Sequence, residues 1–442
     1  MGKLLKRALL ITLDILLALA SSLSAQKLAV GKFQLDNGLK VMILEDHSTP
    51  IVSVQVWYRV GSRNERTGET GLSHMLEHMS FKGSSKLKSE EFSQIVQRNG
   101  GTDNASTSYD FTRYYTDIGS DKLELILEYY ADMMSGLTLG EEEFTSERDV
   151  VREEKRLRDN SPFGRLAAEF NATAFVAHPY RNPIIGWDSD IDAWTTDKIR
   201  DYYSLYYVPN NATLVIAGDV ETASALGMAR KHFGPIPRGA SPPPVAAVEP
   251  EQVGEKRIKV HKEDATSPAI LIGYHIPSFD HPDQYALDVI STILSSGKSS
   301  RLYKSLVYEK ELALSAGGGG SERIDPAIFS ISALARPGVD IAKVEEALLV
   351  ELDRLKDEDV PDREFRKAMN QATSGFTFGR QSVSSLAFEI GLYEAMGSYA
   401  YVQNYLDNLS KVTKEDIKSV ARKYFTEPNR TVAILVPGKL GE

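Results

Sequence analysis

The alternation of hydrophobic and polar positions along the chain predicts short strands and helices in its first half. Apolar residues alternate around Asn37-Gly38 over residues 33–43, which is a strong hairpin signal, and alternate again over residues 51–60. Apolar residues at helical spacing then continue to about Gly83. The following pattern predicts a helix at 89–98, strands at Thr102–Thr107 and Thr112–Gly119, and helices at 122–134, 141–158 and 164–175.

The second half repeats part of this pattern. Residues 207–216 and residues 426–435 each contain the end of a helix, a Pro-Asn turn and a closing strand. A strand-like segment precedes a helical one in both halves, at residues 53–61 and at residues 268–278. A repeat of this kind indicates a duplicated unit of strands and helices.

The length of the chain agrees with two such units. About 417 residues follow the first 25, which is too many for one ordinary core and suits two domains of about 200 residues each. We expect these domains at residues 26–238 and 257–442, joined by a linker at residues 239–256 that is rich in Pro and Ala. The hydrophobic content of 42% argues against disorder as an alternative.

Residues 1–25 have the features of a secretory signal peptide. Three basic residues precede an apolar run over residues 8–20, and small residues follow. The run is too short for a comfortable membrane span, although Asp14 within it leaves an uncleaved, weakly anchored form as an alternative. We therefore expect an exported protein, located in the periplasm if the source is a Gram-negative bacterium.

Charge and cysteine content narrow the possible partners and metals. Residues 1–25 carry three basic and one acidic side chain, so their removal would lower the formal net charge from −10 to −12. Such an acidic chain is not expected to bind nucleic acid. The sequence contains no cysteine, which excludes disulfides and thiolate ligands. A metal would therefore be bound by His, Asp or Glu.

A metal-binding pattern occurs at residues 71–79, which contain His74, Glu77 and His78. On a helix, positions i and i+4 lie one turn apart, so the two imidazoles would project from one face with Glu77 beside them. Neutral imidazoles bind zinc, and a nearby carboxylate can accept a proton from zinc-activated water. The spacing HxxEH is the inverted zincin motif. The alternative is two incidental histidines on a surface helix.

A zinc site with two histidines needs a third protein ligand and a position left open for water. The helix expected at residues 141–158 contains Glu147 and Glu154, which are seven residues apart and share one helical face. Glu154 is a candidate by its chemistry, but the spacing alone does not exclude Glu153 or Glu147. A solvated charged face is the alternative for this helix.

The HxxEH segment together with the segment from Glu147 to Glu154 resembles the pitrilysin family of zinc peptidases, which includes insulin-degrading enzyme and mitochondrial processing peptidase. The resemblance covers nearly all of the chain after residue 25. It implies a processing-peptidase-like α+β fold with two homologous domains, each a mixed, mostly antiparallel sheet flanked by helices. It also implies one Zn²⁺ per chain. Further matching positions are Asp110, Tyr114, His178-Pro179-Tyr180 and Gly186.

The resemblance also assigns roles to the matched residues. It implies that Glu77 is the catalytic base. It implies that the substrate, a peptide, lies along a sheet edge. The implied zinc ligands are His74, His78 and Glu154, the implied supporting carboxylate is Glu147, and the implied substrate-binding residues are Asn104, Ala105, Ser106 and Thr107.

The second half departs from the family pattern. In family members that act alone, an arginine and a tyrosine of the second domain bind the substrate and stabilise the tetrahedral intermediate. Val307 and Leu314 occupy the matching positions here, and neither can donate a hydrogen bond. Arg301 and Tyr303 lie nearby and are an alternative source of donors. Because some family members divide these tasks, the resemblance implies a zinc subunit in a heterodimer with a homologous companion that supplies Arg and Tyr.

Two other segments resemble glycine-rich motifs of other proteins, but their details do not support those functions. Residues 296–299 resemble the end of a phosphate-binding loop, but Thr292 stands where the first glycine is required, so we expect no nucleotide. Residues 317–320 are four consecutive glycines, for which we expect a flexible turn between strands.

The sequence therefore predicts an exported zinc endopeptidase that hydrolyses peptides or unfolded polypeptides in a closed chamber. The alternative is a non-catalytic subunit that binds peptides or builds a complex. The intact HxxEH motif favours the enzyme, because a purely structural subunit has no need of Glu77.

Overall fold

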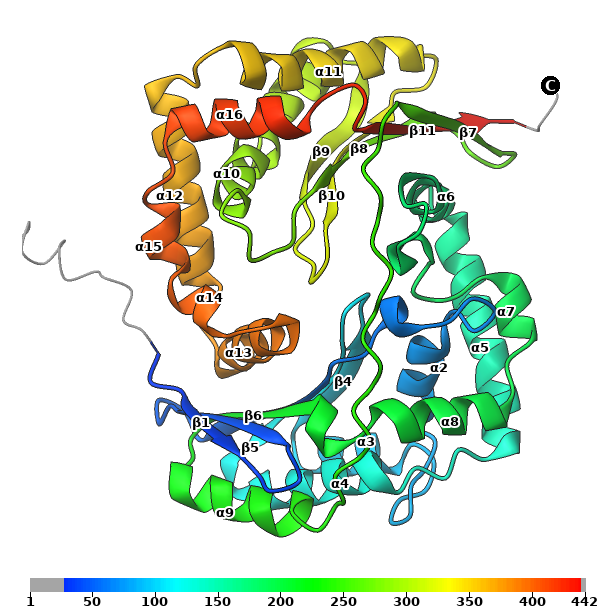
Figure 1. The fold of residues 1–442 in the computed structure, drawn as a ribbon, viewed down its shortest axis with the longest axis vertical. Coiled ribbons are helices and arrows are strands. Elements are labelled where there is room, and N and C mark those ends of the chain that lie inside the picture. Colours follow the sequence, from blue (N-terminus) through cyan, green and yellow to red (C-terminus); the bar gives the residue numbers. More distant parts are fainter. Residues whose placement is uncertain (1–27, 439–442) are drawn as a thin grey trace, which may run out of the picture.

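The computed structural model describes residues 28–438, so the segment predicted as a signal peptide lies outside the described residues. Figure 1 shows two halves, each built on one sheet with helices around it. Between residues 28 and 438, no helix is both long enough and apolar enough to cross a bilayer.

The two sheets share the order and directions of five strands, and the first sheet has one additional antiparallel strand at its edge. In each sheet, one parallel pair of strands is followed by three antiparallel neighbours. This arrangement confirms the predicted fold class of two homologous domains with mixed, mostly antiparallel sheets. In spatial order the first sheet contains β1 (Gly31–Gln34), β2 (Lys40–Glu45), β6 (Ala212–Gly218), β3 (Ile51–Tyr58), β5 (Thr112–Gly119) and β4 (Thr102–Thr107). The second sheet contains β7 (Lys256–Lys262), β11 (Arg430–Pro437), β8 (Ala269–Ile276), β10 (Ala327–Ala335) and β9 (Ala313–Gly320).

The helices of the first half up to residue 174 match the predicted ranges within a few residues, although the helix that carries the HxxEH motif ends earlier than expected, and no range was predicted for the later helices of this half. The helices of the first half are α2 (Leu72–Met79), α3 (Glu91–Arg98), α4 (Leu123–Ser135), α5 (Glu141–Asn160), α6 (Gly164–Ala174), α7 (Asp188–Asp192), α8 (Thr196–Tyr206) and α9 (Thr222–Phe233). The second half contains α10 (Gln284–Ser295), a π-helix (Tyr303–Glu309), α11 (Ile341–Asp357), α12 (Asp362–Phe378), α13 (Val383–Met396), α14 (Ala400–Gln403), α15 (Tyr405–Leu409) and α16 (Lys414–Tyr424).

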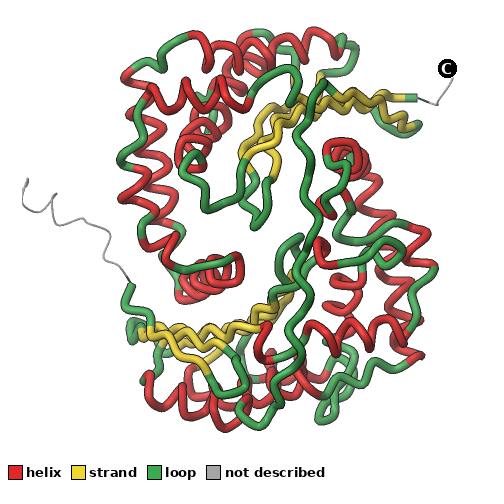
Figure 2. The backbone as a smooth tube through the Cα atoms, in the orientation of Figure 1, coloured by secondary structure: helices red, strands yellow, loops and turns green. Residues whose placement is uncertain are grey.

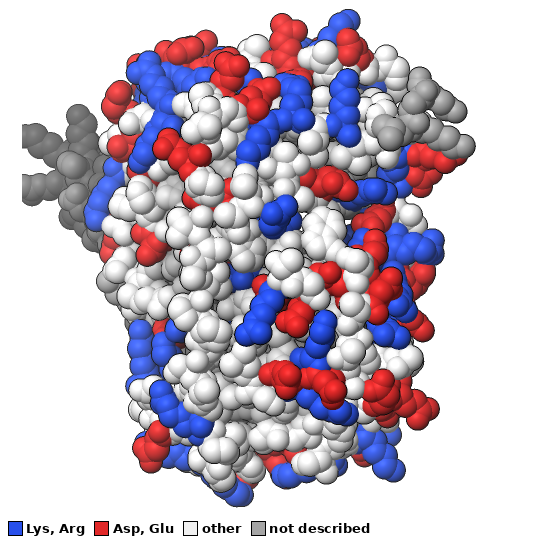
Figure 3. All heavy atoms as spheres, turned by 45° about the vertical axis from the view of Figure 1, so that its right-hand side comes forward, with Lys and Arg blue, Asp and Glu red and all other residues white. Residues whose placement is uncertain are grey.

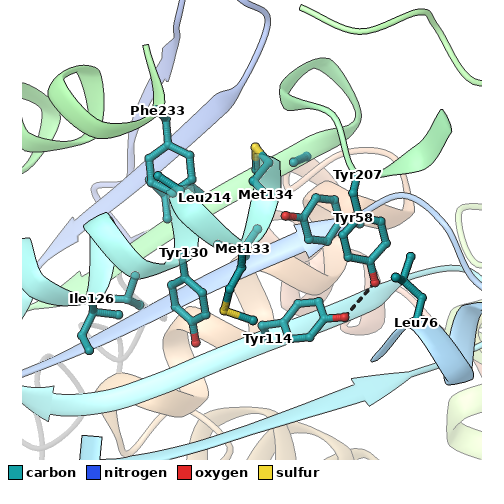
Figure 4. Close-up of a cluster of buried hydrophobic side chains, with 14 of the residues drawn as sticks. Tyr58, Leu76, Tyr114, Ile126, Tyr130, Met133, Met134, Tyr207, Leu214 and Phe233 are labelled. Carbon is teal, nitrogen blue, oxygen red and sulfur yellow. Dashed lines mark hydrogen bonds between the residues drawn. The ribbon is translucent and has the colours of Figure 1, made fainter. Parts of the chain in front are cut away.

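The core of the first half fixes helix α2 against its sheet. Figure 4 shows Leu76 of α2 close to Tyr114 and Tyr207, with Tyr58 and Met133 in the same cluster. The hydroxyls of Tyr114 and Tyr207 are 2.8 Å apart and share a hydrogen bond, so these buried polar groups are satisfied. Because Leu76 is fully buried, the residues on either side of it in the HxxEH motif are held in fixed positions.

Each half contributes one helix to the sheet of the other half (Figure 1). Helix α13 of the second half packs on β3 and β6, where Ile390 lies in one apolar cluster with Trp57 and Val215. Helix α6 of the first half packs on β11, where Phe170 lies in one cluster with Leu435. The two halves therefore share apolar cores as well as a covalent connection.

Polar contacts and a long loop also join the halves. The carboxylate of Asp325, in the second half, is 2.7 Å from Nη1 of Arg63 and 3.0 Å from Nε2 of His178. Nearby, the hydroxyl of Tyr180 donates to Asp110 at 2.6 Å. Figure 2 shows the connection between α9 and β7 as a loop that runs from one half to the other. The predicted boundaries of the domains stay predictions.

The turn expected at residues 317–320 is wrong, because these glycines belong to strand β9. They pair with β10, with Gly317 opposite Ser332 and Gly320 opposite Phe329. A Cβ atom at Gly318 would lie 2.0 Å from the carbonyl oxygen of Ser330. Glycine permits this close approach, but four glycines carry no apolar alternation from which a strand could be predicted.

Candidate metal centre and active site

Helix α2 follows an irregular loop in which the buried side chain of Glu65 binds the first N–H groups of the helix. Gly71 precedes the helix with a φ of 89°, a left-handed conformation that favours glycine. The carboxylate of Glu65 accepts hydrogen bonds from the backbone N–H groups of Gly71 at 2.7 Å and Ser73 at 2.8 Å. Burial raises the pKa of Glu65 to about 8, although these backbone hydrogen bonds oppose the shift. Glu65 therefore stabilises the start of helix α2 through the hydrogen bonds that it accepts, and not through a full negative charge at neutral pH. The sequence gives no local signal for this contact.

The structure brings together His74 and His78 of α2 and Glu154 of α5. Their closest ligand atoms all lie within 4.8 Å of one another. Oε2 of Glu154 is 3.5 Å from Nε2 of His74 and 3.5 Å from Nε2 of His78. In the described part of the chain, this is the only group of three His, Asp or Glu side chains with such spacing.

This group fits a zinc ion. Bonds of about 2.0 to 2.1 Å at tetrahedral angles place two ligand atoms roughly 3.3 Å apart, close to the 3.5 Å observed between Glu154 and each histidine. Two imidazoles and one carboxylate form the ligand set of a catalytic zinc site, which keeps a fourth position for water or substrate.

The acidic helix α5 resolves the choice among its three carboxylates. Glu153 lies on the outside, where it accepts hydrogen bonds from Arg156 at 2.6 and 2.9 Å. Oε1 of Glu147 is instead 2.8 Å from Nδ1 of His78, and its Oε2 is 2.9 Å from Nζ of Lys82. Glu147 thus orients His78 so that its other nitrogen, Nε2, faces Glu154.

The pKa values of the two histidines are shifted in opposite directions. Burial, aided by the charge on His78, lowers the pKa of His74 to about 4, which leaves that ring neutral and able to bind a metal at neutral pH. Burial also acts to lower the pKa of His78, but hydrogen bonds to Glu147 and Glu154 raise it to about 9. Metal binding would therefore displace a proton from His78.

Glu77 lies on helix α2, on the same helix as His74 and His78. Its Oε2 accepts a hydrogen bond from the hydroxyl of Thr107 at 2.5 Å. Burial raises the pKa of Glu77, although the Thr107 hydrogen bond opposes this. A carboxylate with a raised pKa accepts a proton more readily near neutral pH. We expected Thr107 to contribute only to the sheet edge, and its side-chain contact with Glu77 was not predicted.

Residues Asn104, Ala105, Ser106 and Thr107 lie in β4, which is at the end of the first sheet and pairs only with β5 within it. The outer edge of β4 is therefore available for another strand. The backbone N–H of Ala105 donates to the side-chain oxygen of Asn104 at 2.8 Å, and a bound strand would replace this contact.

The remaining motif residues support the position of these elements. Gly186 has a φ of 93°, and a Cβ atom there would lie 2.6 Å from the carbonyl oxygen of Thr70, just before α2. Tyr114 connects the hydroxyl of Ser80 at 2.9 Å to that of Tyr207. His178 makes a contact between the halves and lies outside the metal-binding group.

The second half contains no equivalent of the expected arginine and tyrosine at the matched positions. Val307 lies in the π-helix and Leu314 lies in β9, where Leu314 is 52% exposed. The nearby Arg301 is buried and binds both carboxylate oxygens of Glu364, at 2.9 and 2.6 Å. Arg301 is therefore already occupied by an ion pair within the second half.

Substitution of Glu154 tests the third ligand. We expect Glu154→Gln to lower zinc affinity by about 100-fold or more, because the loss of even a residue that supports a ligand costs 10- to 100-fold. Glu153→Gln on the same helix is the matched control and should retain zinc, since Glu153 faces Arg156. Zinc content after dialysis is the measurement. Equal zinc content in the two variants would remove Glu154 from the site.

The fold and this group of side chains define a zinc-peptidase architecture, and comparison with known proteins places the chain within a family. A family model described as Insulinase (Peptidase family M16) matches residues 40–188, and one described as Peptidase M16 inactive domain matches residues 193–372. Zinc protease PqqE of Helicobacter pylori is 36% identical over 439 residues, which covers 98% of this chain and 99% of that protein. The chain belongs to peptidase family M16, which confirms the resemblance to pitrilysin-type zinc peptidases.

Solved structures agree with this assignment. The crystal structure of a protease from Helicobacter pylori is similar to this chain with a TM-score of 0.91 and 36% identity, over 93% of this chain and 100% of that one. A peptidase M16 inactive domain from Pseudomonas fluorescens gives a TM-score of 0.84 at 16% identity, over 94% and 99% of the two chains. At that identity the second likeness concerns the fold alone.

Proposed function

We propose that this chain is an exported zinc endopeptidase that hydrolyses peptides or unfolded polypeptides. The observation that carries the proposal is the convergence of His74, His78 and Glu154 within 4.8 Å, with Glu77 on the same helix as the two histidines. When bound there, Zn²⁺ would supply Lewis acidity that polarises the scissile carbonyl and makes a water molecule more acidic.

In this mechanism Glu77 moves the proton. Its carboxylate accepts a proton from the attacking water and then delivers that proton to the amine that leaves. Thr107 holds Oε2 of Glu77 by its hydrogen bond and so fixes the direction in which the carboxylate points. Glu147 does the same for His78 through its contact with Nδ1.

The substrate would bind as an added strand on the edge of β4. Backbone groups of residues 104–107 would then form hydrogen bonds with the peptide backbone, and these bonds place little demand on sequence. Since Thr107 lies in this strand and also contacts Glu77, the added strand would run past the catalytic base.

The partner and the location follow from other observations. The absence of donors at Val307 and Leu314 supports a heterodimer in which a homologous companion supplies Arg and Tyr. The features of residues 1–25 support export, to the periplasm in a Gram-negative bacterium. Figure 3 shows acidic and basic side chains interspersed on the face in view, which does not favour a nucleic-acid partner.

A non-catalytic peptide-binding subunit is the second candidate. The family model that matches residues 193–372 is described as an inactive domain, which favours a binding role for the second half of the chain. The first half retains Glu77 next to the metal-binding group, and this favours catalysis for the whole chain.

Metal analysis and a peptidase assay on the purified chain test the proposed function. We expect one zinc per chain and slow cleavage of an unstructured peptide, followed by mass spectrometry over a long incubation. Cleavage should stop when a chelator removes the metal and return when Zn²⁺ is added. Cleavage that persists in the metal-free chain, or a chain that binds no zinc, would contradict the proposal.

A further inference from the structure

A cavity of about 600 Å³ lies beside the strand on which the substrate would bind. Its first wall is formed by β5 together with Thr102 of β4, and its second wall by helices α12 and α13 of the other half. Phe388 and Tyr393 of α13 contribute aromatic side chains to this second wall. The cavity thus joins the edge of the first sheet to the second half of the chain.

Strand β5 directs charged side chains into this cavity by simple alternation. Its even-numbered residues from Thr112 to Thr116 are buried in the core, whereas Arg113, Tyr115 and Asp117 are only partly buried and line the cavity. In the register of β4 and β5, Arg113 lies opposite Ser106 and Asp117 lies opposite Thr102. Residues opposite each other face the same side of the sheet.

The two faces of β4 therefore have different surroundings. Thr107 faces helix α2 and contacts Glu77, while its neighbour Ser106 lies on the opposite side of the sheet, the side of Arg113. A peptide added to β4 would alternate in the same way. One side chain of the peptide on the cavity side would lie near Arg113, at the end close to the catalytic base. A side chain four residues further along the peptide, roughly 13 to 14 Å away, would lie near Asp117.

Within residues 28–438, the guanidinium of Arg113 and the carboxylate of Asp117 form no salt bridge with another residue, and they attract each other only at longer range. The guanidinium of Arg113 lies 4.4 Å from the ring centre of Tyr115 and 4.6 Å from that of Phe388, which fixes its position. Nε of Arg113 and Oδ1 of Asp117 are buried without a hydrogen bond. Unsatisfied buried polar atoms are unfavourable, so both side chains would gain from a charged partner.

The other charged residue of the cavity is already neutralised. Glu389 of α13 accepts two hydrogen bonds from Arg380, at 2.8 and 2.7 Å. The charges that remain for a ligand are therefore one positive group at the end near Glu77 and one negative group at the far end.

We propose that Arg113 and Asp117 form a two-charge specificity site for the substrate strand. Arg113 recognises an acidic side chain, and Asp117 recognises a basic side chain four residues away. Because a strand added to β4 has one polarity, the site distinguishes the order Glu-x-x-x-Lys from the order Lys-x-x-x-Glu. This inference rests on the proposed function, since it requires a peptide along β4.

Two isomeric peptides test the site. They contain the same residues and differ only in the order of Glu and Lys, so net charge and composition cannot explain a difference. We would measure binding by fluorescence anisotropy with the zinc-loaded full chain carrying Glu77→Gln, which prevents cleavage. We expect one isomer to bind about tenfold more tightly, the effect of one ion pair in a partly buried site.

Substitutions in the same background assign the effect to the two residues. Arg113→Gln and Asp117→Asn should each bring the ratio of the two dissociation constants closer to one. Arg113→Lys should retain part of the difference. The exchange Arg113→Asp with Asp117→Arg should invert the preference. Arg230→Gln, on the exposed face of α9, is the matched control and should leave the ratio as it is. Thermal melts of each variant separate lost binding from lost folding.

Three results of this binding experiment would contradict different parts of the two proposals. A chain that binds both isomers equally contradicts this inference but leaves the proposed function standing. A chain that binds neither isomer contradicts peptide binding on β4, and therefore both proposals. A preference that the exchange variant does not invert would show that other residues select the peptide.

Discussion

Glu77→Gln is expected to abolish peptide hydrolysis while zinc remains bound. The amide has the shape of the carboxylate but cannot accept the proton of the attacking water, and general-base catalysis contributes about 10²- to 10⁴-fold to the rate. The hydrogen bond from Thr107 can still be accepted by the amide oxygen, so the local structure should be retained. The measurement is the rate of peptide cleavage beside the zinc content of the same sample.

The control for this substitution is Glu153→Gln, which removes the same charge from an exposed position on α5. It should cleave the peptide as the unmodified chain does. If Glu77→Gln turned over peptide at an undiminished rate with zinc bound, Glu77 could not be the base. If it lost zinc, the residue would contribute to the metal site and not only to proton transfer.

The second large effect is expected from the second half of the chain. Purified without other chains, the protein should bind zinc yet cleave an unstructured peptide about 100- to 1000-fold more slowly than it does with a homologous companion, which is the usual cost of losing a donor to the developing oxyanion. Val307 and Leu314 provide no such donor, and Arg301 is held by Glu364. The rate with and without the companion is the measurement.

A double substitution gives an independent control within one chain. Val307→Arg combined with Leu314→Tyr places the expected donors at the matched positions, and Leu314 is exposed enough to accept a larger side chain. We expect this variant to recover part of the missing rate without a companion. Full activity of the unmodified chain alone, unchanged by a companion, would show that the donors are not needed in trans.

The local parts of the site could be predicted from sequence because their spacing lies within one helix. His74, Glu77 and His78 fall within five residues, and the geometry of a helix brings them together without any knowledge of the fold. Glu154 is different, because residues 147, 153 and 154 are all acidic and only the packing of α5 on α2 decides which one faces the histidines. The family resemblance implied Glu154 as the ligand, and the structure places its Oε2 3.5 Å from Nε2 of each histidine.

The parts that could not be predicted depend on contacts between distant segments. The carboxylate of Glu65 reaches the start of α2 through an irregular loop, and the hydroxyl of Thr107 reaches Glu77 across 30 residues. No periodic pattern of apolar residues in the sequence indicates such contacts. Strand β9 was missed for a related reason, since Gly318 is required by the close approach of β10 and the run of four glycines shows no alternation.

The exchange of helices α6 and α13 limits how this protein can admit a polypeptide. Each sheet has part of its apolar surface covered by a helix from the opposite half, so a clamshell movement within one chain would expose residues such as Trp57 and Phe170 to water. The space between the halves is therefore expected to keep a nearly constant width. A polypeptide that enters such a space is therefore expected to do so as a single extended segment.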